Sequence, residues 1–228
     1  MRLLKWLEEV ISPRGLKCLC CDDRSDGEFL CPTCRKALAA MRITEENAAD
    51  SIRSVFNYDG VARQLVILLK DHCVADAAQA LSKEMAAAVE EMHLPEDTVL
   101  TWVSMPDVRR KVRGIDHGRT LCEAVAAQTG RPCRQLLVRH KNSHTQRGLN
   151  REARLKNIAS SIRCEEKITT PVLLIDDVLT TGATVTACAE ALREAGAPQE
   201  FALTATRVAV RAGKRKNREV DRYGLFTP

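Results

Sequence analysis

Two adjacent acidic residues, followed by a turn rich in hydroxyl groups, carry the clearest chemistry in this sequence. Asp176 and Asp177 come directly after the apolar run 172–175 and precede Thr180, Thr181, Gly182, Ala183 and Thr184. Four consecutive apolar residues, some of them β-branched and preceded by Pro171, predict a buried strand of a parallel sheet. The two carboxylates are therefore expected at the carboxyl end of that strand.

The turn at 180–184 is expected to be the N-terminus of a helix. Apolar residues recur downstream at helical spacing up to Gly196, on the face formed by Ala187, Cys188, Ala191, Leu192 and Ala195. Free backbone N–H groups and the positive end of the helix dipole bind a phosphate dianion, and a glycine lets the ligand approach closely. The carboxylates repel phosphate, so they are expected to accept hydrogen bonds from a neighbouring diol or to face Mg²⁺. A sugar 5-phosphate satisfies both requirements.

The run 172–184 resembles the phosphoribosyl pyrophosphate (PRPP) motif of type I phosphoribosyltransferases, which places two acidic residues between a hydrophobic strand and a Thr-Thr-Gly-Ala-Thr turn. The resemblance implies that Asp176 and Asp177 attend the ribose 2- and 3-hydroxyls and take part in catalysis. It also implies that residues 180–184 hold the 5-phosphate. The structural alternative is an ordinary strand–turn–helix junction with an incidental pair of aspartates.

Cysteines cluster near the beginning of the chain. Five of the ten cysteines lie between positions 18 and 34, and four of them form two Cys-x-x-Cys pairs, Cys18, Cys21, Cys31 and Cys34. Two such pairs complete a closed tetrahedral site, for which a structural zinc ion is the favoured interpretation. An iron–sulfur cluster and a redox dithiol are the alternatives. Cys20 has no partner at the same spacing and is expected to be a free neighbour.

The middle of the chain is strongly basic. Residues 101–163 contain 14 Lys or Arg against four Asp or Glu, although the formal net charge of the whole chain is only +5. This imbalance predicts a polyanionic ligand, either a diphosphate or nucleic acid, and the alternative is a solvated arginine-rich surface. In the first case Arg109, Arg110 and Lys141 are expected to bind the diphosphate, and Arg147 or Lys141 to neutralise charge as the bond breaks.

No part of the sequence predicts a signal peptide or a membrane span. The apolar positions of residues 1–12 are interrupted by Lys5, Glu8 and Glu9, and no run approaches the roughly 18 apolar residues that a span requires. We therefore expect a cytoplasmic protein without membrane insertion, in which paired cysteines bind metal rather than form disulfides.

The remaining pattern alternates between strands and helices. Strands are expected at 54–58, 99–105, 136–138, 172–175 and 201–206, and helices at 61–69, 75–92 and 117–129. This alternation predicts an α/β fold with a mainly parallel sheet, whose ligands bind beyond the carboxyl ends of the strands. Two domains are expected: an N-terminal helix with a four-cysteine zinc module at 1–43, and a phosphoribosyltransferase-like domain at 44–228.

Over nearly its whole length the chain resembles ComF-type competence proteins. The shared features, in order, are the cysteine pairs, Phe56-Asn-Tyr58-Asp-Gly60, Ser104-Met-Pro106 with its following arginines, Gln146-Arg-Gly148-Leu149 with Arg154 and Asn157, and the 172–184 run. Many relatives carry a second set of cysteine pairs and an aromatic-Asn-Gln sequence where this chain has Ile115-Asp116-His117. The resemblance implies one zinc ion, Mg²⁺ bound with PRPP, and an association in some bacteria with DNA uptake during natural transformation.

Two functions are compatible with these features. In the first, the protein is an enzyme that transfers phosphoribosyl from PRPP to an unidentified nitrogen acceptor and releases pyrophosphate. In the second, it senses PRPP or a nucleotide without catalysis and binds single-stranded DNA or a competence protein. Few aromatic side chains are present for base stacking, so any DNA binding is expected to be mainly electrostatic and sensitive to salt.

Overall fold

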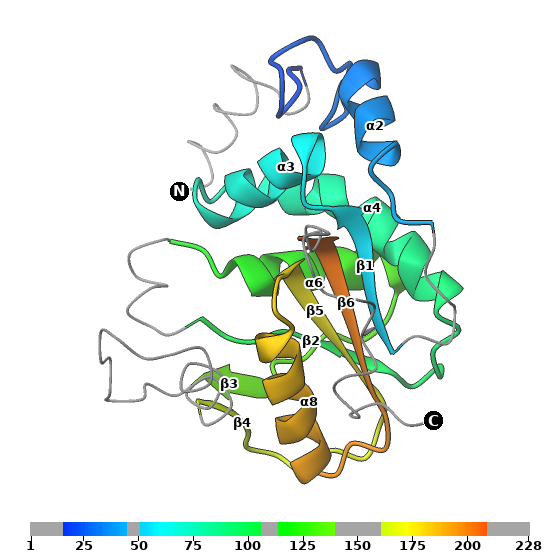
Figure 1. Ribbon diagram of the computed structural model, residues 1–228, viewed down its shortest axis with the longest axis vertical. Helices are drawn as coiled ribbons and strands as arrows, with labels where there is room; N and C mark the ends of the chain where they lie inside the picture. Colours follow the sequence, from blue (N-terminus) through cyan, green and yellow to red (C-terminus); the bar gives the residue numbers. More distant parts are fainter. Residues whose placement is uncertain (1–15, 45–50, 106–113, 140–160, 209–228) are drawn as a thin grey trace, which may run out of the picture.

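Four parallel strands form the central sheet of the chain. The computed structural model describes residues 16–44, 51–105, 114–139 and 161–208. The strands within these ranges lie side by side (Figure 1) in the order β1 (Ile52–Asn57), β6 (Glu200–Arg207), β5 (Val172–Leu179) and β2 (Val99–Thr101). A separate antiparallel ribbon pairs β3 (Leu137–Arg139) with β4 (Ile162–Cys164). The expected α/β class with a mainly parallel sheet is confirmed.

Helices cover both faces of this sheet. On one face α3 (Gly60–Lys70), α4 (Ala75–Glu91) and α6 (His117–Thr129) share a hydrophobic cluster with the sheet. On the other face α8 (Ala183–Glu194) packs with the β3–β4 ribbon in a second cluster (Figure 1). Among the described helices, none combines the length and the low polarity that crossing a bilayer requires.

The helices form where apolar residues recur at helical spacing. In α3 the buried positions are Ala62, Leu65, Val66 and Leu69, and the helix begins after Asp59, whose carboxylate accepts a hydrogen bond from the amide of Gly60 at 2.8 Å. In α4 the small side chains of Ala77 and Ala78 are fully buried, which allows close packing of this helix against α6. The helices predicted at 61–69, 75–92 and 117–129 are confirmed to within a residue or two.

The cysteine segment joins the main core rather than forming a core of its own. Leu30 and Leu38, the latter in α2 (Pro32–Ala39), belong to the same hydrophobic cluster as α3 and α4. Beyond α2 the backbone pairs antiparallel with β1, since the amide of Asn57 donates to the carbonyl of Met41 at 3.0 Å and that of Ile43 donates to Val55 at 2.9 Å. The division of the chain at residues 43 and 44 stays a prediction.

Four local features differ from the sequence-based expectations. Strand β5 continues through Asp176 and Asp177 to Leu179 instead of ending at residue 175. Strand β2 ends at Thr101 instead of continuing to 105, because the chain then turns to the ribbon, where Val103 pairs with Leu137. Neither β4 nor α2 was expected. Only Ile162 of β4 is buried and α2 is eight residues long, so neither shows a clear apolar period.

Replacing Leu81 with alanine tests the packing of α4. Leu81 is fully buried in the cluster that joins α4 to α6 and the sheet. Leu81→Ala should lower the free energy of unfolding by about 2–5 kcal/mol, since the substitution removes buried apolar surface and leaves a cavity. The control Leu16→Ala, at a position that is 52% exposed, should change it by less than about 0.5 kcal/mol. Urea unfolding measures both, and equal losses would contradict this packing.

Candidate functional site

The turn between β5 and α8 is open to solvent. Gly182 precedes α8 with a positive φ of 76°, and no side chain caps the first N–H groups of the helix. Thr180 and Thr181 are exposed and Thr184 is partly exposed, so neighbouring atoms do not fill the turn. The first amides of α8 therefore remain available to an anionic ligand.

Asp176 and Asp177 point to opposite faces of β5. Successive side chains of a strand alternate between its two faces. Asp177 follows Leu173 and Ile175 toward the cluster that contains α3 and α6, whereas Asp176 follows Leu174 toward the cluster that contains α8. The two carboxylates are neighbours in sequence but lie in different surroundings.

The carboxylate of Asp177 is buried and ion-paired. Its side chain is 4% exposed, and Lys70 Nζ at the end of α3 lies 3.0 Å from Oδ1 and 2.9 Å from Oδ2. His117 Nε2, from the first residue of α6, lies 3.4 Å from Oδ2. The assignment of Asp177 to a ribose hydroxyl stays a prediction, and it requires this carboxylate to exchange Lys70 for the ligand.

The carboxylate of Asp176 has fewer partners. Burial, followed by the charge of Asp177, raises the pKa of Asp176 to about 7, although the Asp177 amide, Lys70 and Arg139 act in the opposite direction. The Asp177 amide donates to Asp176 Oδ1 at 2.9 Å. A carboxyl group with such a raised pKa at a strand end is typical of a binding site, because hydroxyl donors or a cation would stabilise its charged form.

Three described residues near the aspartates were missed by the sequence analysis. They are Lys70, His117 and Arg139, and they come from α3, α6 and β3. Within the described part of the chain, the buried Nε atom of Arg139 has no hydrogen-bond partner. No spacing rule links these three positions to residue 176, since the order of the strands brings them together. Arg109, Arg110, Lys141 and Arg147 lie outside the described residues.

Asp116 contacts the backbone at both Met105 and Arg119. Its Oδ2 accepts a hydrogen bond from the Met105 amide at 3.1 Å, and its Oδ1 accepts one from the Arg119 amide at 3.3 Å as the N-cap of α6. Met105 follows the end of β2, and Asp176 lies in the C-terminal half of β5. Because these two strands are parallel, both residues lie toward the carboxyl edge of the sheet. Asp116 therefore joins the start of α6 to the segment that follows β2.

Four cysteine sulfurs converge as the spacing predicts. The Sγ atoms of Cys18, Cys21, Cys31 and Cys34 all lie within 4.8 Å of one another. Cys21 Sγ lies 3.5 Å from the sulfurs of both Cys31 and Cys34. Four thiolates around a tetrahedral zinc ion at about 2.3 Å stand roughly 3.8 Å apart, so this cluster fits such an ion. The predicted four-cysteine cluster is confirmed.

The pKa of Cys18, in the cluster, differs from the pKa of Cys20, the fifth cysteine of this segment. Burial raises the pKa of Cys18, but hydrogen bonds from the backbone at Cys31, Cys20 and Cys21 outweigh it and lower the pKa to about 6. Burial and then the charge of Cys18 raise the pKa of Cys20 to about 12. Thiolates are the metal ligands, and the lowered pKa of Cys18 favours that form. The pKa values of Cys21 and Cys34 are raised like that of Cys20, so it is the position of its sulfur that sets Cys20 apart from the cluster.

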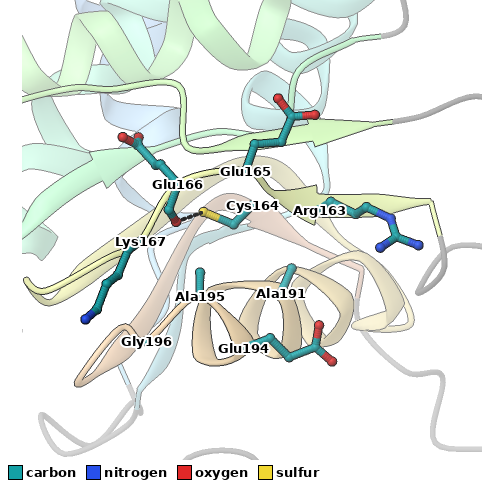
Figure 2. Close-up of a pocket in the computed structure, with 9 residues that line it drawn as sticks. All are labelled: Arg163, Cys164, Glu165, Glu166, Lys167, Ala191, Glu194, Ala195 and Gly196. Carbon is teal, nitrogen blue, oxygen red and sulfur yellow. Dashed lines mark hydrogen bonds between the residues drawn. The ribbon is translucent and has the colours of Figure 1, made fainter.

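A polar groove lies away from the aspartates. It has a volume of about 560 Å³ and runs between the chain after β4 and the C-terminal end of α8 (Figure 2). Within its lining, the Cys164 thiol donates a hydrogen bond to the carbonyl of Glu166 at 3.3 Å. The carboxylates of Glu165 and Glu194 point in different directions (Figure 2). Because α8 starts at the carboxyl edge of the sheet and runs back along it, this groove belongs to the opposite edge.

No protein-family model matches the chain, and no curated protein matches it. Among solved structures it is similar to a glutamine PRPP amidotransferase from B. subtilis complexed with ADP and GMP, with a TM-score of 0.37 and 22% identity over 56% of this chain and 25% of that one. It is also similar to a hypoxanthine phosphoribosyltransferase from Trypanosoma cruzi, with a TM-score of 0.35 and 14% identity. That match covers 63% of this chain and 68% of the other. The chain thus spans a quarter of the amidotransferase. These overlaps are partial, and the fold rests on the strand order and register of this chain alone.

Replacing Asp176 with asparagine should stabilise the fold at neutral and higher pH. The folded chain holds the Asp176 proton up to about pH 7, whereas the unfolded chain releases it near its ordinary value of 3.8. The wild type therefore loses stability as the pH rises between these two values. Asp176→Asn should have a free energy of unfolding about 1–3 kcal/mol higher than the wild type at pH 8, and the gap should narrow toward pH 4.

Urea unfolding at pH 4 and pH 8 measures this difference. The matched control is Asp97→Asn, which removes the same charge at an exposed position and should leave the free energy of unfolding nearly unchanged at both pH values. A lower stability of Asp176→Asn at pH 8 would show that the carboxylate is well solvated or well paired.

The cysteine cluster should bind one zinc ion per chain. Cys34→Ser removes a ligand and should abolish stoichiometric zinc, while Cys20→Ser should retain it, because Cys20 lies outside the four converging sulfurs. Elemental analysis of the purified full chain measures the metal content. Equal zinc loss in both variants, or iron with sulfide in the wild type, would contradict the assignment.

Proposed function

We propose that the chain binds PRPP at the carboxyl edge of its parallel sheet and transfers the phosphoribosyl group to a nitrogen acceptor, with release of pyrophosphate. The observation that carries the proposal is the open junction between β5 and α8. There the uncapped first turn of α8 follows the left-handed Gly182, and Thr180 and Thr181 are exposed in the same turn. A phosphate dianion gains hydrogen bonds and the favourable helix dipole at that position.

The neighbouring groups support a sugar phosphate rather than inorganic phosphate alone. Asp176 lies in β5, three residues before the strand ends at Leu179, and burial followed by the charge of Asp177 raises its pKa. Ribose hydroxyls donate hydrogen bonds to a carboxylate and so stabilise its charged form. Arg139, with its unpartnered Nε within the described residues, supplies a positive charge on the same side of the strand.

The reaction requires positioning and charge stabilisation more than a covalent nucleophile. The transition state resembles an oxocarbenium ion, so the chain must hold the ribose and the departing diphosphate in line with the acceptor. Asp176 would hold the ribose or Mg²⁺, and magnesium bound with PRPP would neutralise charge on the diphosphate. Arg109, Arg110, Lys141 and Arg147 are proposed, from the sequence alone, to bind the diphosphate and to offset its negative charge.

We further propose zinc as the ion of the four-cysteine cluster, in a structural role. The cluster supplies four sulfur ligands and no open coordination position, so it is not expected to activate water or substrate. Its contacts run to α3, where Gln64 Nε2 donates to the carbonyl of Cys20 at 2.8 Å. The module would thus stabilise the helix layer that supplies Lys70. A link to DNA uptake or to competence proteins stays a prediction of the ComF resemblance.

Binding of PRPP should depend on Mg²⁺ and on Asp176. Calorimetric titration of the full chain should show PRPP binding that weakens at least about tenfold in Asp176→Asn, since a charge-assisted hydrogen bond contributes roughly 1.5–3 kcal/mol. The matched control is Glu194→Gln, which removes a negative charge at the groove on the opposite edge of the sheet and should bind like the wild type. Absence of any binding heat at millimolar PRPP with Mg²⁺ would overturn the proposed site.

A pyrophosphate-release assay separates catalysis from sensing. Nucleobases, ammonia and glutamine serve as acceptors, and transfer predicts release with at least one of them. If PRPP binds but none supports release, the alternative of a non-catalytic PRPP-sensing protein is favoured.

A further inference from the structure

Two cysteines outside the metal cluster meet beneath α6. The Sγ atoms of Cys122 and Cys133 lie 2.9 Å apart, and both thiols are reduced. The distance is too long for a disulfide bond, which measures about 2.05 Å, but short enough for an S–H···S hydrogen bond. The two sulfurs are therefore already in contact in the folded chain.

The backbone holds the two sulfurs in this position. Cys122 lies on the buried face of α6, which ends at Gly130 in the left-handed conformation. The chain then returns alongside β2, where the amide of Leu100 donates to Pro132 at 2.8 Å and that of Arg134 donates to Leu100 at 2.9 Å. Because these bonds flank Cys133 on both sides, the sulfur contact follows from the fold and not from a mobile side chain.

The two thiols are chemically unequal. Cys122 is fully buried, whereas Cys133 is partly exposed. The Cys122 thiol donates a hydrogen bond that lowers the pKa of Cys133, and Arg119 lowers it further while burial and Glu123 oppose the change. The pKa of Cys122 is raised by the same hydrogen bond and by burial. A partly exposed thiol with a lowered pKa in contact with a buried second thiol is the arrangement found at redox-sensitive cysteines.

We propose that Cys122 and Cys133 form an oxidation-sensitive dithiol, which closes to an intramolecular disulfide when a hydroperoxide oxidises Cys133. This inference is independent of the proposed transferase function, since it concerns the middle of α6 and the chain after it and not the turn at 180–184. The Cys164 thiol serves as a contrast, because it is partly exposed but donates to the carbonyl of Glu166.

The chemistry balances in two steps. The Cys133 thiolate attacks one oxygen of hydrogen peroxide, the O–O bond breaks, and hydroxide leaves to give a sulfenic acid on Cys133. The Cys122 sulfur then attacks Cys133 Sγ, the S–O bond breaks, and the departing oxygen leaves as water with the Cys122 proton. Two thiols have lost two electrons to the peroxide, and a thiol reductant reverses the change.

The consequence would be a covalent tie between α6 and the chain beside β2. The start of the same helix carries Asp116, which binds the Met105 amide, and His117, which faces Asp177. A disulfide that closes the short loop from 122 to 133 restricts the unfolded chain and should raise the melting temperature of the protein.

Peptide mapping of the full, metal-loaded chain tests the proposal. The protein is treated with hydrogen peroxide, remaining thiols are alkylated, and trypsin releases residues 120–134 as one peptide, since the bond before Pro132 resists cleavage. The expected product carries no alkyl group and is lighter than the reduced peptide by two hydrogen atoms. Further cleavage after Glu123 should leave two pieces held together until a thiol reductant is added.

Matched variants decide the order of the steps. Cys122→Ala should accumulate a sulfenic acid on Cys133, which dimedone traps, whereas Cys164→Ala should form the disulfide at the wild-type rate. The proposal is overturned if both thiols of the wild type remain open to alkylation, if Cys133 proceeds to sulfinic acid without a disulfide, or if the disulfide forms only in urea. The mass of the wild-type peptide shows whether the disulfide forms even if a variant fails to fold.

Discussion

Strand β5 is buried on both faces, and this burial places the two aspartates of the candidate site in different surroundings. Apolar side chains fill both faces of β5 up to Ile175, and of the next two residues Asp177 stays buried while Asp176 is partly buried. A carboxylate in such surroundings requires a partner, because burying a charge without one is costly. Asp177 has that partner in Lys70, while Asp176 has weaker ones and titrates near neutral pH. The same alternation that builds the core thus gives Asp177 an ion-pair partner and leaves Asp176 with a raised pKa.

The parallel topology explains why so many elements meet near these acids. Strands β1, β2 and β5 all run in the same direction, so the chain segments that follow them leave from one edge. The helices α3 and α8 begin directly after β1 and β5, and α6 begins after the longer connection from β2. Uncapped amides at α8 and the N-cap Asp116 at α6 are consequences of this arrangement. The function proposed for this edge uses groups that the fold already gathers there.

The cysteine cluster depends on the main core as well as on its own sulfurs. Cys31 is the N-cap of α2, and its sulfur accepts the amide of Cys34 at 3.4 Å, so the start of a helix stabilises the thiolates. Cys18 and Leu38 pack into the cluster shared with α3. Arg42 links the segment to α4 through Glu84 at 2.7 Å. The convergence of the four sulfurs and the packing of the core therefore depend on the same few residues.

Periodicity along the chain predicted much of this fold. The apolar spacing of α3, α4, α6 and α8 and the apolar run of β5 are local properties, and they fixed these elements to within a few residues. The spacing of the two Cys-x-x-Cys pairs likewise predicted which four cysteines come together. The short β4 and α2 carried no period that could have revealed them. The roles of Arg109 and Arg147, which lie outside the described residues, stay predictions from sequence.

The sequence by itself determined that a strand, two aspartates and a threonine turn follow one another, and that four cysteines share a site. Only the tertiary structure decided that Asp177 turns toward Lys70, 107 positions earlier in the chain, and that Arg139 approaches Asp176. It also decided that Cys122 meets Cys133. The physical reason is that helix and strand periods act over a few residues, whereas these contacts depend on strand order and on which helix covers which face.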